Sequence, residues 1–340
     1  MAQFRILTPA DLQEILVAFG FAERDYLGHT PIAAGTINTN VRVETPTGPR
    51  FLRVNEGKSE DDVAREAAIV AHLAAGGAGV PTPRPVSTAS GRPYLVWRDH
   101  FVSLFPWVTG RVLHRGELEV GHVAQVGGAL ARLHLRGASF ADHRPGRYEP
   151  DELARRLVQV RAHVTGAPHP DRALVEALET LEPALARLGE ERARTPVPLG
   201  LIHGDLFVDN VLFSAQAPGA PVGEATLVAL LDFEQASWGR WIYDVAVTLL
   251  AFAFGRTDFR MELVRALLDG YQAERRLGDA EGELLGTELR FAACRFAVTR
   301  ITDVYLKRTA GAPAGKDFRR YLARLARVEA HLARDPRAFL

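Results

Sequence analysis

Cysteine is nearly absent from this sequence: Cys294 is the only one among 340 residues, which excludes an intrachain disulfide. Lysine is scarce as well, since only Lys58, Lys307 and Lys316 occur and arginine carries the rest of the positive charge. An excess of either charge sign is also missing, because 41 basic and 41 acidic residues cancel. This balance argues against nucleic-acid binding as a main task, since that task needs a basic surface.

The sequence also lacks a segment that could span a membrane. Its longest mainly apolar run, residues 245–254, is shorter than the roughly 20 residues that a transmembrane helix needs, and the first residues do not begin a signal peptide. The content of 47% hydrophobic and 24% charged residues is that of an ordinary globular protein. We therefore expect a reduced, cytoplasmic protein with no nucleic-acid or membrane partner, either a monomer or a homodimer.

Residues 201–213 form the most informative stretch, in which apolar residues flank a short polar segment. This segment holds His203, Asp205 and Asn210. Four residues separate Asp205 from Asn210, which is the spacing of the catalytic loop in phosphotransferases. In such a loop the Asp accepts a proton from the attacking hydroxyl and the Asn oxygen holds magnesium. We therefore predict Asp205 as the catalytic base and Asn210 as a metal ligand.

A second polar motif follows a predicted buried strand at residues 227–231. Asp232 comes directly after that strand, where it can supply a second magnesium ligand. Taken alone, each motif has a simpler interpretation: Gly204 and Asp205 could form a turn, and residues 232–234 could be a strand end. Because the two motifs occur in this order, each bounded by apolar strand signals, phosphotransfer is favoured.

The order of the predicted elements indicates an α+β chain with two lobes. Hydrophobic periodicity predicts a first helix near 8–20, followed by strands at 26–34, 38–45, 50–54, 93–98 and 101–105. A helix that begins after Ser59 is inserted among these strands. The rest of the chain is predicted to form helices near 123–136, 150–165, 170–189, 244–254, 258–274, 281–309 and 316–333. We expect a small antiparallel-sheet lobe with one main helix over 1–104, a hinge over 105–110, and a larger, mostly helical lobe over 111–340. A nucleotide would bind between the lobes.

Two segments of the first lobe are predicted to contact the nucleotide. The link between its first two strands can cover phosphates, because a glycine allows close backbone approach and polar residues offer donors. These residues are Gly35, Thr36, Asn38 and Thr39. The same link could instead be a polar hairpin. At the hinge, backbone groups near Phe105 and Trp107 are expected to face the adenine edge, although Trp107 could simply be a core residue.

Arg53 lies on the predicted third strand, where a phosphotransferase needs a cation. Glu66, in the second turn of the following helix, is spaced to pair with it, as a strand lysine pairs with a helix glutamate in protein kinases. Lys58 falls in a turn, so we assign the role to Arg53, whose forked charge can clamp α/β-phosphate oxygens. The simpler interpretation of Glu66 is a solvated helix residue.

Two further residues are predicted to support the catalytic loop without reacting. His203 is expected to shape the loop. Asp244 opens the apolar helix after the second motif, and its carboxylate could hold backbone amides of residues 203–210. The alternative for Asp244 is an ordinary first-turn acid stabilised by the helix dipole.

Together the motifs resemble the aminoglycoside phosphotransferase/choline kinase superfamily, which shares the protein-kinase-like fold. The residues that carry this resemblance are His203-Gly204-Asp205 with Asn210, Asp232-Phe233-Glu234, and Trp241 to Asp244. Within the superfamily the sequence is most similar to the homoserine kinase type II branch, over residues 35–40, 203–213, 243–247 and 295–303, with Lys316-Asp317. Arg53 departs from the usual lysine, as in choline kinases, and Glu234 departs from the aromatic residue expected in that branch.

The resemblance implies transfer of the γ-phosphoryl group of ATP to the hydroxyl of L-homoserine, a step of threonine biosynthesis. It also implies Mg²⁺ as the metal and a small-molecule alcohol as the partner. Choline, an aminoglycoside or another small alcohol remains open as the acceptor. A nucleotide-binding scaffold without turnover also remains open.

A mixed helical face near the C-terminus suits an amino-acid acceptor. Phe296, Arg300, Asp303 and Lys307 fall roughly on one side of the predicted helix. Arg300 could bind a carboxylate and Asp303 an ammonium group, whereas an aminoglycoside would prefer an acidic surface and choline an aromatic cage. Surface ion pairs are an equally simple interpretation of each of these residues.

Overall fold

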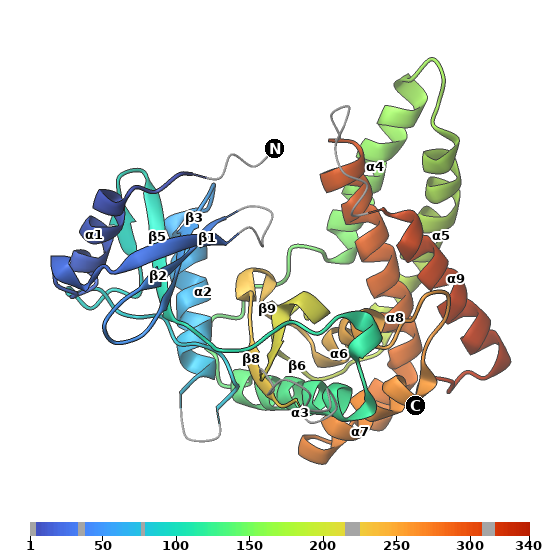
Figure 1. Cartoon of the computed structure of the whole chain (residues 1–340). Helices are drawn as coiled ribbons and strands as arrows, with labels where there is room; N and C mark the ends of the chain where they lie inside the picture. The colour runs from blue at the N-terminus through green and yellow to red at the C-terminus, as the bar shows by residue number, and fades with distance from the viewer. Residues whose placement is uncertain (1–4, 33–37, 76–78, 215–224, 308–316) are drawn as a thin grey trace. The chain divides into compact units, whose positions relative to one another are not determined.

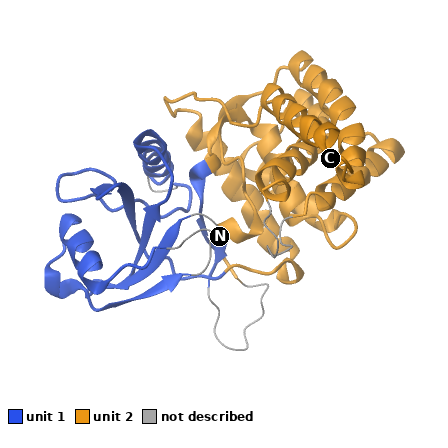
Figure 2. Ribbon diagram, turned by 90° about the horizontal axis from the view of Figure 1, so that it is seen from above, with its two compact units in different colours: residues 1–111, 211–215, 227–234 blue, residues 112–210, 216–226, 235–340 orange. Residues whose placement is uncertain are grey.

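The computed structural model describes residues 5–32, 38–75, 79–214, 225–307 and 317–340 (Figure 1). The chain forms two compact units, which Figure 2 shows in different colours. The first unit contains residues 1–111, 211–215 and 227–234, and the second contains residues 112–210, 216–226 and 235–340. A smaller unit built on a sheet and a larger, mostly helical unit confirm the predicted α+β class.

The first unit is built on an antiparallel five-stranded sheet in the order β1-β2-β3-β5-β4. Its strands are β1 (Gly28–Ile32), β2 (Thr39–Glu44), β3 (Arg50–Asn55), β4 (Leu95–Trp97) and β5 (His100–Pro106). Buried and half-buried residues alternate along β2, which is typical of a sheet covered on one face. The core of this unit joins the sheet to α1 (Pro9–Ala18) and includes Leu12, Ile15, Leu16, Val41, Val43 and Leu52. The other long helix of this unit is α2 (Glu60–Leu73), which is capped by Ser59.

The first unit extends further along the chain than the predicted lobe. Strand β5 runs to Pro106, so the predicted hinge over 105–110 begins inside a strand. Arg111 then exchanges two backbone hydrogen bonds with Phe213, of 2.8 and 2.9 Å. This pairing joins two later strands to the unit, β7 (Val211–Phe213) and β8 (Leu227–Leu230). Periodicity along the chain could not show it, because the paired segments are far apart in the sequence.

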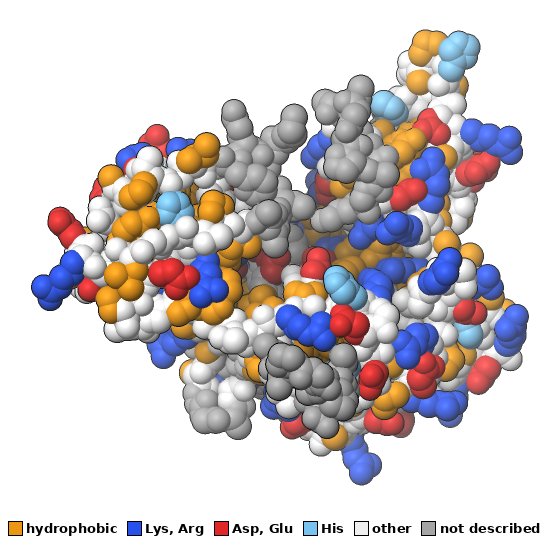
Figure 3. Space-filling model, viewed as in Figure 1, with side chains coloured by type: hydrophobic (Ala, Val, Ile, Leu, Met, Phe, Trp, Pro, Cys, Tyr) orange, Lys and Arg blue, Asp and Glu red, His pale blue; other side chains and the backbone are white. Residues whose placement is uncertain are grey.

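The second unit is mostly helical. Its helices are α3 (Val120–Gly137), α4 (Pro150–Gly166), α5 (Arg172–Arg194), α6 (Trp241–Phe252), α7 (Met261–Glu274), α8 (Asp279–Arg300) and α9 (Arg319–Arg334), and β6 (Leu199–Ile202) pairs with β9 (Ser237–Arg240). Every residue of α6 is buried, so this helix forms the centre of the unit. Within the described residues, no helix is both long and apolar enough to cross a bilayer. Acidic and basic side chains are interspersed over the helices on the face shown in Figure 3.

Two features of the second unit differ from the sequence prediction. The helix expected over 281–309 gives way after Arg300 to a π-helical turn, Ile301–Tyr305. In this turn the Thr302 hydroxyl donates to the carbonyl oxygens of Val298 and Thr299 (3.3 and 3.4 Å), a side-chain interaction that bends helices. Strand β9 was not predicted, because its four residues show no apolar alternation.

Helices α3 and α7 cross so closely that only glycine fits at the contact. A Cβ atom on Gly127 would overlap the Leu267 carbonyl oxygen, and one on Gly270 would overlap the Ala124 carbonyl oxygen. Both obstacles are backbone atoms, which cannot rotate away. The two helices therefore hold each other at a fixed separation.

We expect Gly270→Ala to lower the free energy of unfolding by about 1–3 kcal/mol or more, because the two helices must separate. Chemical denaturation measures the change. Gly121→Ala is the matched control, since it lies on α3 and its added Cβ would meet nothing within 4 Å. There alanine should stabilise the helix by up to about 1 kcal/mol. Equal stability of Gly270→Ala and the wild type would contradict the close crossing.

Candidate active site

The loop that holds Asp205 connects β6 to β7. Gly204 has a φ of +74°, and a Cβ there would lie 2.8 Å from the Gln235 carbonyl oxygen, so the position requires glycine. Asn210 donates from Nδ2 to the carbonyl oxygen of Asp205 (2.9 Å), which joins the two ends of the loop. Because its nitrogen is engaged there, Asn210 keeps its amide oxygen for another partner, and an oxygen ligand suits magnesium.

Asp244 is fully buried beneath this loop. Its carboxylate accepts hydrogen bonds from the backbone N–H groups of His203 (2.7 Å) and Gly204 (2.8 Å). Both groups lie in the segment 203–210, whose backbone amides Asp244 was predicted to hold. It also pairs with Nε2 of His134 at 3.1 Å. Burial opposes the charge, but the hydrogen bond with His134 and the loop contacts hold the pKa of Asp244 below its ordinary value. The side chain of His203 is likewise fully buried.

Asp205 contacts a residue to which the sequence analysis gave no role. Nη1 of Arg295, on α8, donates to Oδ1 of Asp205 at 3.2 Å. Arg295 is buried, and its guanidinium lies 4.4 Å from the ring centroid of Tyr148 and 3.9 Å from that of Phe296. Asp205 itself keeps 33% of its side chain exposed. The signal for Arg295 was an arginine inside the apolar stretch 291–298.

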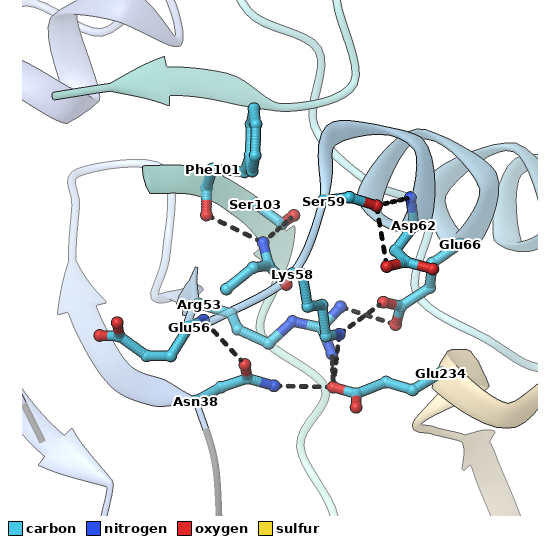
Figure 4. Close-up of polar contacts among 11 residues, drawn as sticks. Asn38, Arg53, Glu56, Lys58, Ser59, Asp62, Glu66, Phe101, Ser103 and Glu234 are labelled. Carbon is cyan, nitrogen blue, oxygen red and sulfur yellow. Dashed lines mark hydrogen bonds and ion pairs between the residues drawn. The ribbon is translucent and has the colours of Figure 1, made fainter. Parts of the chain in front are cut away.

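In the first unit a buried group of charges joins β3, α2 and the segment after β8 (Figure 4). Arg53 pairs with Glu66 at 2.7 Å and lies 3.5 Å from Glu234. Burial lowers the pKa of Arg53, but Glu66 and Glu234 outweigh it and raise that pKa overall. Glu66 is buried, so its interpretation as a solvated helix residue is wrong.

Lys58 belongs to the same group of charges, although the sequence analysis set it aside because it falls in a turn. Its Nζ lies 3.2 Å from Glu66 and 2.6 Å from Glu234. The long lysine side chain reaches from the end of the turn to the glutamates that Arg53 contacts. Burial raises the pKa of Glu66, but Arg53 and Lys58 together hold it below its ordinary value.

Asp232 follows β8 with a φ of +64°, in the left-handed region that aspartate tolerates better than most side chains. Its carboxylate belongs to the first unit. Burial lowers the pKa of Arg53, whereas Glu66, Glu234 and, to a smaller extent, Asp232 raise it. Asn210 belongs to the second unit. Each residue offers an oxygen atom, the kind of ligand that Mg²⁺ prefers.

The predicted phosphate loop is only partly visible. Gly35 and Thr36 lie outside the described residues. Asn38 donates to Glu234 (2.7 Å) and accepts from the backbone N–H of Glu56 (3.2 Å). The Thr39 hydroxyl accepts from the backbone N–H of Arg5 and donates to Glu56, both at 3.0 Å. The polar groups of Asn38 and Thr39 are therefore engaged within the first unit.

The two hinge residues are held by the sheet. Phe105 lies in β5 opposite Phe51, and its ring centroid is 5.6 Å from the Arg53 guanidinium. The backbone N–H of Trp107 donates to the Pro49 carbonyl oxygen (3.2 Å). The N–H group of Trp107 is therefore engaged within the first unit.

The residues predicted to bind the acceptor have different surroundings. Asp303 accepts from Nη1 of Arg156 with both carboxylate oxygens (2.9 and 3.0 Å) and lies 3.8 Å from Lys307. The alternative interpretation, a surface ion pair, describes this geometry. Arg300 instead lies with its guanidinium 4.5 Å from the ring centroid of Tyr321.

We expect Glu66→Gln to weaken ATP binding by about 10–100-fold, since charge-assisted hydrogen bonds contribute about 1.5–3 kcal/mol. Without the Glu66 carboxylate, Arg53 and Lys58 would both turn toward Glu234. Titration of the purified protein with ATP measures the dissociation constant. Glu60→Gln is the control, because Glu60 lies on the same helix with its side chain 51% exposed. An unchanged ATP affinity in Glu66→Gln would rule out this role.

The pair of His134 and Asp244 predicts a pH dependence of stability. Burial lowers the pKa of His134, so the unfolded chain takes up this proton first as the pH falls below about 6.5. The free energy of unfolding then drops by up to about 1.4 kcal/mol per pH unit for this group. Asp244, with its lowered pKa, adds a further loss only below about pH 4.

Urea denaturation between pH 8 and pH 5 tests this expectation. The slope of stability against pH should be smaller in His134→Gln than in the wild type, and unchanged in His163→Gln, which alters an exposed histidine on α4. Identical slopes in all three proteins would show that His134 does not stay neutral in the fold.

Comparison with known proteins identifies relatives of this chain. The sequence is 32% identical over 321 residues to the homoserine kinase of Nitrobacter winogradskyi, covering 92% of this chain and 89% of the relative. It is 35% identical to the homoserine kinase of Rhodospirillum rubrum, covering 80% and 79%. A microcompartment-associated aminopropanol kinase has the same fold, with a TM-score of 0.68 at 19% identity over 97% of this chain and 99% of that one.

The sequence also matches the Phosphotransferase enzyme family over residues 28–283. This match includes the loop around Asp205, the strand before Asp232 and the Arg53–Glu66 pair. The predicted resemblance and the predicted protein-kinase-like fold are therefore confirmed. The chain belongs to the phosphotransferase enzyme family.

Proposed function

We propose that the protein is an ATP-dependent kinase that phosphorylates the hydroxyl group of L-homoserine. Relatives that match this chain over most of their length carry that name. The observation that carries the proposal is the loop 203–210, in which buried Asp244 fixes the backbone and buried Arg295 holds the Asp205 carboxylate. A carboxylate that is oriented and still accessible can accept a proton from a bound hydroxyl.

In this proposal Asp205 orients the acceptor hydroxyl and accepts its proton while the γ-phosphoryl group leaves ATP. Arg295 keeps the carboxylate in one orientation. Asn210 and Asp232 hold Mg²⁺ through oxygen atoms. When bound, the metal neutralises charge on the phosphates. Because the transition state of phosphoryl transfer is loose, positioning and electrostatics supply most of the rate.

The first unit supplies the nucleotide contacts in this proposal. Arg53, held by Glu66, stabilises the α- and β-phosphates, and Lys58 adds a second positive charge to the same group. Gly35 and Thr36 cover the phosphates from the loop before β2. In this proposal the first unit is the nucleotide-binding lobe and the second unit is the catalytic and substrate-binding lobe.

The contacts already made by Asn38 and Thr39 give these two residues a supporting part in the proposal. Through Glu56 and Glu234 they fix the end of the loop that reaches the phosphates. Phe105 packs beside Arg53. In this proposal the enzyme acts in the cytoplasm and is a monomer or a homodimer.

We expect Asp205→Ala to lower kcat by about 10²–10⁴-fold, the range for a lost general base. ADP release with Mg²⁺ and ATP measures it, with L-homoserine, choline, several aminoglycosides or no acceptor. Asp209→Asn is the matched control, since it removes an exposed carboxylate from the same loop. ATP binding should persist in both variants.

The panel of acceptors separates the remaining possibilities. Turnover on L-homoserine above the other compounds supports the proposal. Turnover on another alcohol alone would keep the mechanism and reject homoserine. ATP binding without ADP release on every acceptor would favour a scaffold, and full activity of Asp205→Ala would reject the assigned base.

A further inference from the structure

Three arginine side chains gather around two aromatic residues in the second unit. The guanidiniums of Arg300, at the end of α8, and of Arg324, on α9, each lie 4.5 Å from the ring centroid of Tyr321. Arg324 also lies 5.0 Å from the ring of Phe254, and Nη1 of Arg115 donates to the Phe254 carbonyl oxygen at 3.3 Å. We call Arg115, Arg300 and Arg324 the arginine cluster.

Among the described residues no carboxylate pairs directly with the arginine cluster, and the charges of Asp209 and Asp205 act on Arg115 and Arg300 without such contact. Within the residues that the structure describes, neither Arg300 nor Arg324 forms an ion pair or a hydrogen bond with an acid, and Arg115 donates only to backbone carbonyl oxygens. Arg324 is 9% exposed, and its buried Nη1 has no hydrogen-bond partner in the described part of the chain. Buried cations are normally paired, so this arrangement is that of a site for an anion.

Electrostatics agree with the geometry. Burial lowers the pKa of Arg300 and of Arg324, and the neighbouring arginines lower it further. An anion bound among them would relieve both effects. The three side chains differ in exposure, because Arg115 is exposed, Arg300 is half-buried and Arg324 is buried.

A stack of aromatic rings connects the arginine cluster to the catalytic loop. Tyr321 stacks on Phe296 with the centroids 5.0 Å apart, and Phe296 meets the ring of Phe207 at 5.0 Å. Phe207 is two residues after Asp205. The charge of Asp205 also acts on Arg300, where it partly opposes the lowering of the pKa by burial. Packed aromatic rings therefore link the arginine cluster to the loop that holds the proposed base.

An amino-acid alcohol carries its hydroxyl and its carboxylate close together. In homoserine four bonds separate the hydroxyl oxygen from the carboxylate carbon, a reach of about 5 Å. An acceptor whose hydroxyl meets Asp205 therefore carries its carboxylate into the immediate surroundings of the loop. Arg295 is less suitable as the receptor, because it already donates to Asp205.

We propose that the arginine cluster binds the carboxylate of the acceptor and thereby selects an amino acid over an amino alcohol or an amide. This inference rests on the proposed function and extends it. From its place on the predicted helix, Arg300 alone was expected to bind this carboxylate. Arg115 and Arg324 complete the site from segments distant in the sequence.

The test compares L-homoserine with L-homoserinamide, which keeps the hydroxyl and ammonium groups but lacks the carboxylate. We expect Arg300→Gln and Arg115→Gln to lower kcat/KM for L-homoserine by about 10–100-fold, mainly through KM. For L-homoserinamide the change should be less than about threefold, because a lost carboxylate contact has no effect on it. Arg327→Gln, an exposed arginine one turn along α9 from Arg324, is the matched control and should leave both acceptors unchanged.

Binding of L-2-aminobutyrate, which is homoserine without its hydroxyl, gives a second readout. It should compete with L-homoserine in the wild type and lose affinity by about 10-fold or more in Arg300→Gln. Arg324→Gln is examined together with its thermal unfolding. Should it fail to fold, the two more accessible positions still decide the question.

The outcomes are distinct. Equal losses on both acceptors would overturn the inference, since they would mean that the arginines support the fold or Asp205. A wild type that uses the amide as well as the acid would also overturn it and leave the proposed function intact. A wild type that turns over neither compound rejects the proposed function, and the inference with it.

Discussion

The geometry of the second unit depends on one buried carboxylate, that of Asp244. A buried charge of this kind costs several kcal/mol unless it is fully paired, and here His134 and two loop N–H groups supply the pairing. Because Asp244 opens the fully buried helix α6, the loop can change its backbone only if the centre of the unit changes too. The proposed base is therefore carried on a backbone whose shape is set before any ligand arrives.

Two of the arginines on helix α8, Arg295 and Arg300, differ in their surroundings. Arg295 lies between two aromatic rings and has Asp205 as its hydrogen-bond partner, so its charge is used inside the protein. Arg300, little more than one turn later, lies against Tyr321 with no acid bound to it among the described residues. The chain breaks into a π-helical turn directly after Arg300, which changes the direction of the segment that follows. Helix α8 thus supplies one positive charge that is paired with Asp205 and one that has no acidic partner among the described residues.

Spacing in the sequence predicted roles for Asp205, Asn210 and Asp232. Each motif is only a few residues long and stands next to a strand that is apolar enough to recognise from the sequence. It also predicted the pair of Arg53 and Glu66, since strand alternation and helical periodicity fix their directions. Arg295 was missed because its contact with Asp205 joins segments far apart in the chain. The hydrogen bond from the N–H of Trp107 to Pro49 likewise joins residues that only the fold brings together.

The approach of Lys58 to Glu66 has a consequence for how sequences of this kind are classified. A rule that requires a lysine on the third strand would count this chain as a degenerate, inactive relative. The structure instead places an ammonium group 3.2 Å from the same glutamate, delivered by the turn that follows the strand. The chain thus has an arginine on the strand and a lysine in the turn beside one glutamate. Surveys of pseudoenzymes that score a single alignment column would overlook this lysine.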